Sequence, residues 1–206
     1  LDFVLDKAES LNMKVLLFDD QHFPTGNAGG RLSPENRKLL VRRTGFDMIS
    51  SGNTVSFDFR GYRGKDENIV AASAFPVSPD NRILASEGID LGRKEKTGAL
   101  RLTPGVWRIS VFLSTRDGGE EHTKNHVNYL SSKAVSEYVG IVYESHYDRL
   151  KRHVGKSFIG FFSDEPRLAN AASYDAVPGI YPMPLPWSDE LAERLGSSPG
   201  LLLTHI

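Results

Sequence analysis

The spacing of apolar residues changes twice along this 206-residue chain, and these changes limit the folds that it can adopt. Residues 3–11 carry apolar side chains at helical spacing, and residues 14–18, a lysine followed by four apolar residues, form a run of strand length. This order predicts a helix followed by a buried strand. Ser33-Pro34-Glu35 then supplies an N-cap, a proline at the first helical position and an acid in the first turn, which predicts a short helix through Arg43.

Between residues 45 and 106 the apolar period becomes that of a β-strand. Residues 54–59, 69–75 and 98–102 read as half-buried strands, separated by turns rich in glycine and proline. We therefore expect an inserted antiparallel β subdomain over 45–106 with one buried face. The residues expected to point inward are Phe57, Phe59, Val70, Ala72 and Leu102.

The rest of the chain returns to alternating strands and helices. The pattern predicts a strand at 107–113, a long amphipathic helix at 132–153, a second buried strand at 157–162 and a short helix at 188–195. The strand at 107–113 is consistent with either the β insertion or the α/β part. The sequence thus predicts three segments, 1–44, 45–106 and 107–206, of which the first and third form one α/β domain interrupted by the insertion.

Composition excludes several classes of function. Lysine and arginine number 25 and aspartate and glutamate 26, so the formal charge of −1 argues against nucleic acid as a partner. The absence of cysteine excludes disulfides, thiolate metal sites and a cysteine nucleophile. No apolar run approaches the roughly 20 residues of a transmembrane helix, so we expect no membrane span.

Both predicted α/β strands end in acids: Asp19 and Asp20 follow one, and Asp164 and Glu165 follow the other. Because α/β folds build their sites at such strand ends, we expect both pairs to face one cleft. For Asp19 and Asp20, a structural role in a strand-end turn or a helix cap is as consistent with the sequence as a functional role. Glu165 points more strongly to function, because an acid after a buried strand needs a pocket, and Pro166 restricts its loop.

Other candidate side chains lie on the same predicted rim. Arg116 follows the strand at 107–113 and is expected either to clamp a carboxylate or to be a solvated loop charge. His22 is a candidate substrate contact, but the spacing of histidines and acids fits no metal motif, so neither a metal nor another cofactor is expected. The candidates for stacking on a sugar ring are the aromatic residues at strand ends or in loops: Phe18, Phe23 and Trp187.

Two blocks of sequence carry a family resemblance. KVLLFDDQHFPTGNAGG at 14–30, taken with FIGFFSDEP at 158–166, resembles large bacterial (β/α)8-barrel glycoside hydrolases of the α-L-rhamnosidase-like type. In that family the first block is the second barrel strand with its loop, a β-rich insertion follows, and the Asp-Glu-Pro block ends the fourth strand. The chain departs from the family at Gln21, where members commonly carry an acid, and at Phe23, where they often carry tryptophan.

The resemblance implies an α/β fold, a partial (β/α)8 (TIM-type) barrel with an inserted antiparallel β subdomain. It also implies that Glu165 is the catalytic carboxylate of the fourth strand, acting as general acid. A barrel takes roughly 250 residues, so outside the insertion the chain supplies about half of one. We therefore expect either a fragment, with its sheet edges covered by self-association or by the remainder of a longer parent chain, or a shortened relative of such a barrel. Its location would be the bacterial cytoplasm or outside the cell, if it is secreted.

Two functions of different classes follow. In the first, the chain is part of a glycoside hydrolase in which Glu165, buried beside Phe161 and Phe162, protonates the glycosidic oxygen of an oligosaccharide or glycoside, and Asp164 and Arg116 orient it. The substrate-binding residues would be Asp19, Asp20, His22, Phe23, Arg116 and Trp187. In the second, the chain is a non-catalytic carbohydrate-binding or assembly module derived from such a barrel. A third reading, metal-dependent hydrolysis, would use Asp19, Asp20, His22 and Asp164.

The barrel makes a geometric prediction. Asp19, Arg116 and Glu165 should converge on one face of a parallel sheet, because each follows a predicted strand. The strand at 107–113 should lie between the other two, since right-handed crossovers make successive strands neighbours.

Overall fold

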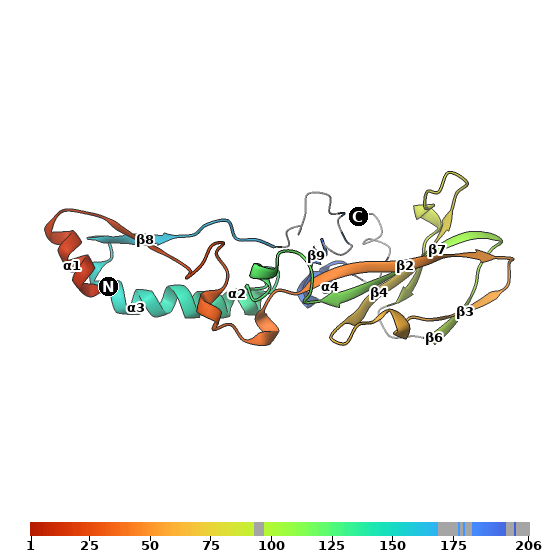
Figure 1. Ribbon diagram of the computed structural model, residues 1–206, viewed down its shortest axis with the longest axis horizontal. Helices are drawn as coiled ribbons and strands as arrows, with labels where there is room; N and C mark the ends of the chain where they lie inside the picture. The colour runs from red at the N-terminus through yellow and green to blue at the C-terminus, as the bar shows by residue number, and fades with distance from the viewer. Residues whose placement is uncertain (93–96, 169–176, 178, 180–182, 197–199, 201–206) are drawn as a thin grey trace. The chain divides into compact units, whose positions relative to one another are not determined.

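The computed structural model describes residues 1–92, 97–168, 177, 179, 183–196 and 200 (Figure 1). The chain forms two compact units. The first contains residues 1–38 and 122–168, and the second contains residues 39–121 and the described residues after 168.

The first unit is built on a parallel pair of strands. Helix α1 (Asp2–Ser10) leads into β1 (Val15–Phe18), which pairs directly with β8 (Phe158–Phe162). Val15 and Leu17 of β1 point into a core formed with α1, α3 and β8, whereas the alternate residues of β1 are exposed. The strands predicted at 14–18 and 157–162 and the helix predicted at 3–11 are confirmed.

A long helical run accompanies this pair of strands. It consists of α2 (Ser132–Val139), a π-helical segment (Gly140–Glu144), α3 (Ser145–Leu150) and a final 3-10 turn (Lys151–His153), and Figure 1 shows α2 and α3 as one continuous rod beside β8. The run confirms the helix predicted at 132–153. Short 3-10 turns occupy Ala28–Gly30, Pro34–Asn36 and Glu121–Thr123.

The second unit is an antiparallel β structure. Its main sheet has the order β5-β4-β7-β2-β9, and a second sheet consists of β3 and β6. The strand bounds are β2 Leu40–Ser50, β3 Thr54–Asp58, β4 Asn68–Val77, β5 Ile89–Gly92, β6 Thr97–Arg101, β7 Gly105–Thr115 and β9 Leu185–Pro186. Further 3-10 turns span Arg60–Tyr62 and Ala85–Glu87.

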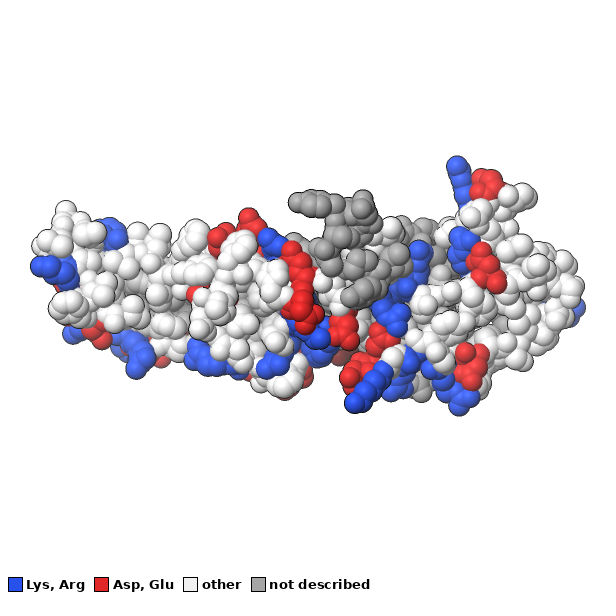
Figure 2. Space-filling view, in the orientation of Figure 1, with Lys and Arg blue, Asp and Glu red and all other residues white. Residues whose placement is uncertain are grey.

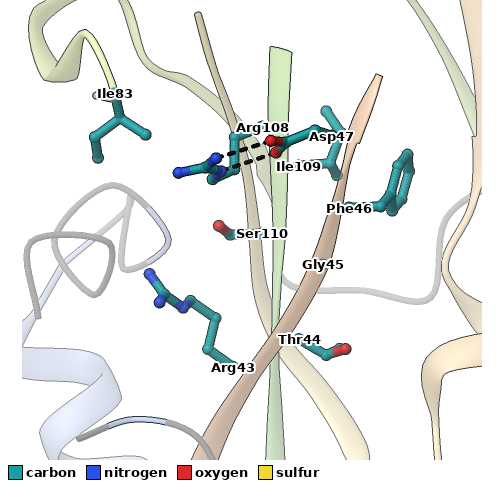
Figure 3. Close-up of a pocket in the computed structure, with 9 residues that line it drawn as sticks. All are labelled: Arg43, Thr44, Gly45, Phe46, Asp47, Ile83, Arg108, Ile109 and Ser110. Carbon is teal, nitrogen blue, oxygen red and sulfur yellow. Dashed lines mark hydrogen bonds and ion pairs between the residues drawn. The ribbon is translucent and has the colours of Figure 1, made fainter. Parts of the chain in front are cut away.

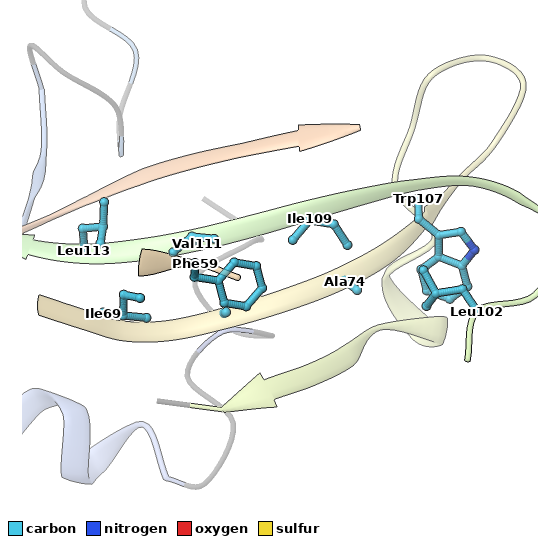
Figure 4. Packing of buried hydrophobic residues seen from close by; sticks show 9 residues of the cluster. Phe59, Ile69, Ala74, Leu102, Trp107, Ile109, Val111 and Leu113 are labelled. Atoms are coloured by element: carbon cyan, nitrogen blue, oxygen red, sulfur yellow. The ribbon is translucent and has the colours of Figure 1, made fainter. Parts of the chain in front are cut away.

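The main sheet is packed on both faces. On one face the β3–β6 pair encloses the largest core cluster, in which Phe59 lies against Val111 and Leu102 beside Trp107 (Figure 4). On the other face Trp187 and helix α4 (Asp189–Arg194) pack on Val41 and Phe112. This helix confirms the one predicted at 188–195.

The expected α/β barrel is wrong. Helix makes up 29% and strand 34% of the structure, and the sheets of the second unit are antiparallel. The physical reason lies in β7, which was expected between β1 and β8: its two edges are taken by β2 and β4, both antiparallel to it. Strands β1 and β8 pair with each other instead.

The helix predicted from Ser33 through Arg43 is also wrong. Only Pro34–Asn36 form a turn of 3-10 helix, and β2 begins at Leu40. Eleven consecutive residues of β2 pair with β7, and this long-range pairing outweighs the local capping signal.

The antiparallel β structure expected within 45–106 is confirmed, although its sheet extends beyond those bounds to β2 and β7. Phe59, Ala72 and Leu102 are buried inward as expected, and the half-buried Phe57 packs against the same cluster. Val70 instead packs on the Trp187 side, because a bulge between Ile69 and Ala71 changes the alternation of β4.

Phe59→Ala is expected to lower the free energy of unfolding of the second unit by about 3–5 kcal/mol, because it leaves a cavity where Phe59 is 1% exposed. Urea denaturation followed by tryptophan fluorescence measures this loss. Ile49→Ala, at a site 84% exposed in the same unit, should change stability by less than about 0.5 kcal/mol. Equal effects of the two substitutions would contradict the core assignment.

Candidate functional site

The carboxyl ends of β1 and β8 are joined by hydrogen bonds through Thr25. The Asp19 amide donates to the carbonyl of Phe162 at 3.0 Å, and the Thr25 amide donates to the carbonyl of Asp164 at 2.9 Å. The Asp164 amide in turn donates to the Thr25 hydroxyl at 3.0 Å. The acid pairs that follow the two strands therefore lie at one end of one sheet, on adjacent strands rather than two strands apart.

Asp19 is a buried carboxylate, 3% exposed, held by two hydroxyl groups. Thr25 donates to Oδ1 at 2.7 Å and Tyr143 donates to Oδ2 at 2.5 Å. Burial, and then the Asp19 carboxylate, raise the pKa of Tyr143 to about 12. Tyr143 therefore stays protonated and keeps its donor role.

Asp20 organises the loop that follows β1. Its Oδ2 atom accepts the backbone amides of Gly26, Asn27 and Ala28 at 2.8, 2.5 and 3.1 Å, and its Oδ1 atom accepts the Gln21 amide at 2.6 Å. Four donors on one carboxylate make this residue the anchor of the loop. Asp20 therefore has the structural role in a turn that was one of the two roles consistent with the sequence.

Two aromatic side chains back the same loop. A Cβ atom at Gly26 would lie 2.8 Å from both His126 Nδ1 and the Tyr129 hydroxyl, so a side chain there would require both rings to shift. Burial, and then the positive charge of Lys38, lower the pKa of His126 to about 4. His126 is therefore a neutral packing partner at physiological pH.

A cavity of about 240 Å³ opens beside Asp19 at the end of β1. Its walls combine carboxylates, a guanidinium, an imidazole and two aromatic rings. The residues that line it are Leu17, Phe18, Asp19, Asp20, Gln21, Ala28, Gly29, Arg31, Val142, His146 and Phe161. The arrangement can offer hydrogen-bond acceptors, donors and apolar ring faces to one small ligand.

Glu165 is exposed, so its expected burial beside Phe161 and Phe162 is wrong. Its side chain is 63% exposed and its Oε2 atom lies 3.1 Å from Nη2 of Arg167. The guanidinium of Arg167 also lies over the ring of Phe23, 5.5 Å from the centroid. The backbone of Glu165 has φ 41°, a left-handed value that is strained for a glutamate.

The remaining candidates do not line this cavity. His22 is exposed in the loop after β1. Trp187 is 1% exposed and belongs to the core of the second unit, so it cannot stack on a sugar. Arg116 follows β7 in the second unit, in a different sheet from β1 and β8, which contradicts the predicted order of strands.

Sequence reasoning missed three side chains of the site. Tyr143 and His146 lie three residues apart on the long helix, where their spacing indicated core packing. Arg31 lies beyond the loop, and its guanidinium donates to the carbonyls of Ala28 and Ile141, both at 3.3 Å. The helical spacing could have placed Tyr143 and His146 on the face toward β1, but nothing local signals Arg31.

Within the described part of the chain, no three His, Asp or Glu side chains group closely enough to hold a metal ion, which leaves the metal-dependent reading without support. No helix in that part is both long and apolar enough to cross a membrane. Basic and acidic side chains are intermixed on the face of the molecule in Figure 2.

A comparison of the chain with protein-family models, with curated proteins and with solved structures finds no match.

Asp20→Asn is expected to loosen the loop after β1, because an amide replaces the charged acceptor of four backbone N–H groups. The cost should be about 1–3 kcal/mol, with faster amide hydrogen exchange at Gly26, Asn27 and Ala28. Asp148→Asn, on an aspartate 76% exposed in the same unit, is the control and should leave exchange unchanged. Unaltered exchange in the Asp20 variant would contradict its anchoring role.

Proposed function

We propose that the first unit binds carbohydrate, with one sugar ring occupying the cavity beside Asp19. The observation that carries this proposal is the mixed lining of the cavity, in which carboxylates, Arg31 and His146 share the walls with Phe18 and Phe161. Sugars present both hydroxyl groups and apolar ring faces, so a site for them needs both kinds of surface.

The size of the cavity supports a small ligand. Its volume of about 240 Å³ is below the roughly 300–1,000 Å³ typical of sites for drug-sized ligands. Each oxygen of Asp19 accepts one hydroxyl from the protein and can accept a further one, because a carboxylate oxygen offers about two lone pairs. Asp19 is thus equipped to accept hydrogen bonds from sugar hydroxyls.

The loop around the cavity is held in place before any ligand arrives. Asp20 fixes its backbone through four amides, and Thr25 joins it to the end of β8. A preformed site spends less free energy on ordering when it binds. This rigidity supports recognition of a weakly binding ligand such as a monosaccharide.

Phe18→Ala should weaken monosaccharide binding about two- to tenfold, because it removes a ring from the cavity wall. We would titrate L-rhamnose, D-glucose and D-galactose, together with their methyl glycosides, into the ¹⁵N-labelled chain and follow the amide shifts of residues 19–23 and 25–31. The expected result is a saturable response to at least one of these sugars.

Phe162→Ala is the matched control. Phe162 lies opposite Phe18 in the β1–β8 register, with ring centroids 5.9 Å apart, and is 51% exposed, yet it does not line the cavity. Its removal should leave binding nearly unchanged. If no sugar in the panel shifts these amides, or if both variants bind equally weakly, the proposal fails.

Glycoside hydrolysis with Glu165 as general acid is the second candidate. The observation in its favour is the strained φ of 41° at Glu165, because strained backbone conformations are found mainly at active sites and other functional segments. Asp19 follows the adjacent strand and is the nearest candidate by topology for the second carboxylate that the reaction requires. The exposure of Glu165 and its pairing with Arg167 favour binding over catalysis as the main proposal.

Glu165→Gln decides between these candidates. If the chain hydrolyses aryl glycosides, the variant should lose activity by about 100-fold or more, because the amide cannot donate the proton. Glu144→Gln, on an exposed glutamate of the same unit, should retain activity. Sugar binding without turnover in the unmodified chain would reject the catalytic role and retain the binding module.

A further inference from the structure

The main sheet of the second unit carries a hollow with a volume of about 530 Å³, separate from the sugar site proposed above. The register of β2 and β7 explains its shape. Gly45 lies opposite Ser110, and this pair of small residues is flanked by the Arg43–Phe112 pair on one side and the Asp47–Arg108 pair on the other.

Gly45 leaves the bottom of the hollow without a side chain. A Cβ atom at this position would overlap the carbonyl oxygen of Ile109, because the two strands approach closely here. A side chain is therefore excluded, and the larger residues on either side become the walls. Figure 3 shows Arg43, Ser110 and Arg108 on the same side of the two strands, with Ile83 across the hollow from Arg43.

One wall of the hollow is already neutralised. Arg108 donates to both carboxylate oxygens of Asp47, each at 2.8 Å, and also to Asn81 Oδ1 at 2.9 Å. This bidentate geometry gives both oxygens of Asp47 a hydrogen bond and fixes the Arg108 guanidinium in place. Asp47 therefore cannot also balance the charge of the opposite wall.

Arg43 and Ser110 lack such partners. Among the described residues the Arg43 guanidinium makes no ion pair or hydrogen bond, although its side chain is half-buried and extends into the hollow (Figure 3). The Ser110 hydroxyl likewise has no hydrogen-bond partner in the described part of the chain, and the residue is 2% exposed. With Arg43 and Arg108 against Asp47, the lining carries one uncompensated positive charge.

We propose that this hollow is an oxyanion-binding site in which Arg43 and Ser110 hold a carboxylate or phosphate group. A guanidinium offers two parallel N–H donors that match two oxygens of either group, and the hydroxyl supplies a further donor. Arg108 stays paired with Asp47, so the net positive charge of the site comes from Arg43. Charge and donor geometry define the class of ligand, and a carboxylate and a phosphate group both meet these requirements.

The test is a titration of the ¹⁵N-labelled chain with sodium phosphate and, separately, sodium acetate, at constant ionic strength. Saturable shifts of the Gly45 and Ser110 amides are expected, and Arg43→Gln should weaken the binding about tenfold or more. A response to phosphate alone identifies a phosphate site, a response to acetate alone identifies a carboxylate site, and a response to both supports the shared chemistry.

Arg82→Gln is the charge-matched control, since Arg82 is 84% exposed in the same unit and should not affect binding. Ser110→Ala is a second variant that keeps the proposal testable if Arg43→Gln disturbs the sheet, and it should weaken binding by a few-fold. Shifts that do not saturate, or that Arg43→Gln and Arg82→Gln weaken equally, would show that the added anions act only by general electrostatic screening. Either result would overturn the proposal.

Discussion

The pairing of β7 on both edges is the constraint on which the second unit depends. β2 matches β7 over eleven residues without a shift, and β4 pairs along its opposite edge. A strand bonded on both edges has no free backbone groups with which to join another sheet. This constraint fixes the β character of the second unit, and it leaves β1 and β8 to pair with each other.

A second constraint acts at the end of the β1–β8 pair. The Asp19 side chain is buried, and a buried polar group is costly unless it is hydrogen-bonded, so the site must surround it with donors. Thr25 and Tyr143 supply them from the loop and from the long helix. The end of β1, the loop after it and the long helical run therefore meet at Asp19, which makes this residue a structural centre as well as a candidate ligand contact.

Local elements of this fold follow from sequence patterns. The alternation at 54–59 and 98–102, the helical spacing at 132–153 and the apolar run at 157–162 each specify their own element, because one face must be buried. Pairing partners do not follow in the same way. The residues of β7 have the pattern of a buried strand in any sheet, and their antiparallel pairing with β2 depends on contacts 55 to 75 positions apart in the chain.

The same division applies to the site. The acids at 19–20 and 164–165 could be placed at strand ends from sequence, and the structure brings them to one end of one sheet. Their roles could not be separated, because they are set by partners that the folded chain supplies: loop amides for Asp20, and the hydroxyls of Thr25 and Tyr143 for Asp19. Trp187 shows the opposite error: an aromatic residue among prolines suggests an open loop, but its partners Val41 and Phe112 are distant in sequence and bury it.

The contrast between Asp19 and Asp20 limits how a ligand can be recognised. The Oδ2 atom of Asp20 already accepts three amides, so its lone pairs are used by the loop. Asp19 accepts one hydroxyl on each oxygen and keeps acceptor capacity, but it is only 3% exposed where it lines the cavity. A ligand must therefore reach inward with a hydroxyl to use it. In the proposed binding, the exposed Phe18 and Arg31 select a ligand by its shape, and Asp19 adds one buried polar contact.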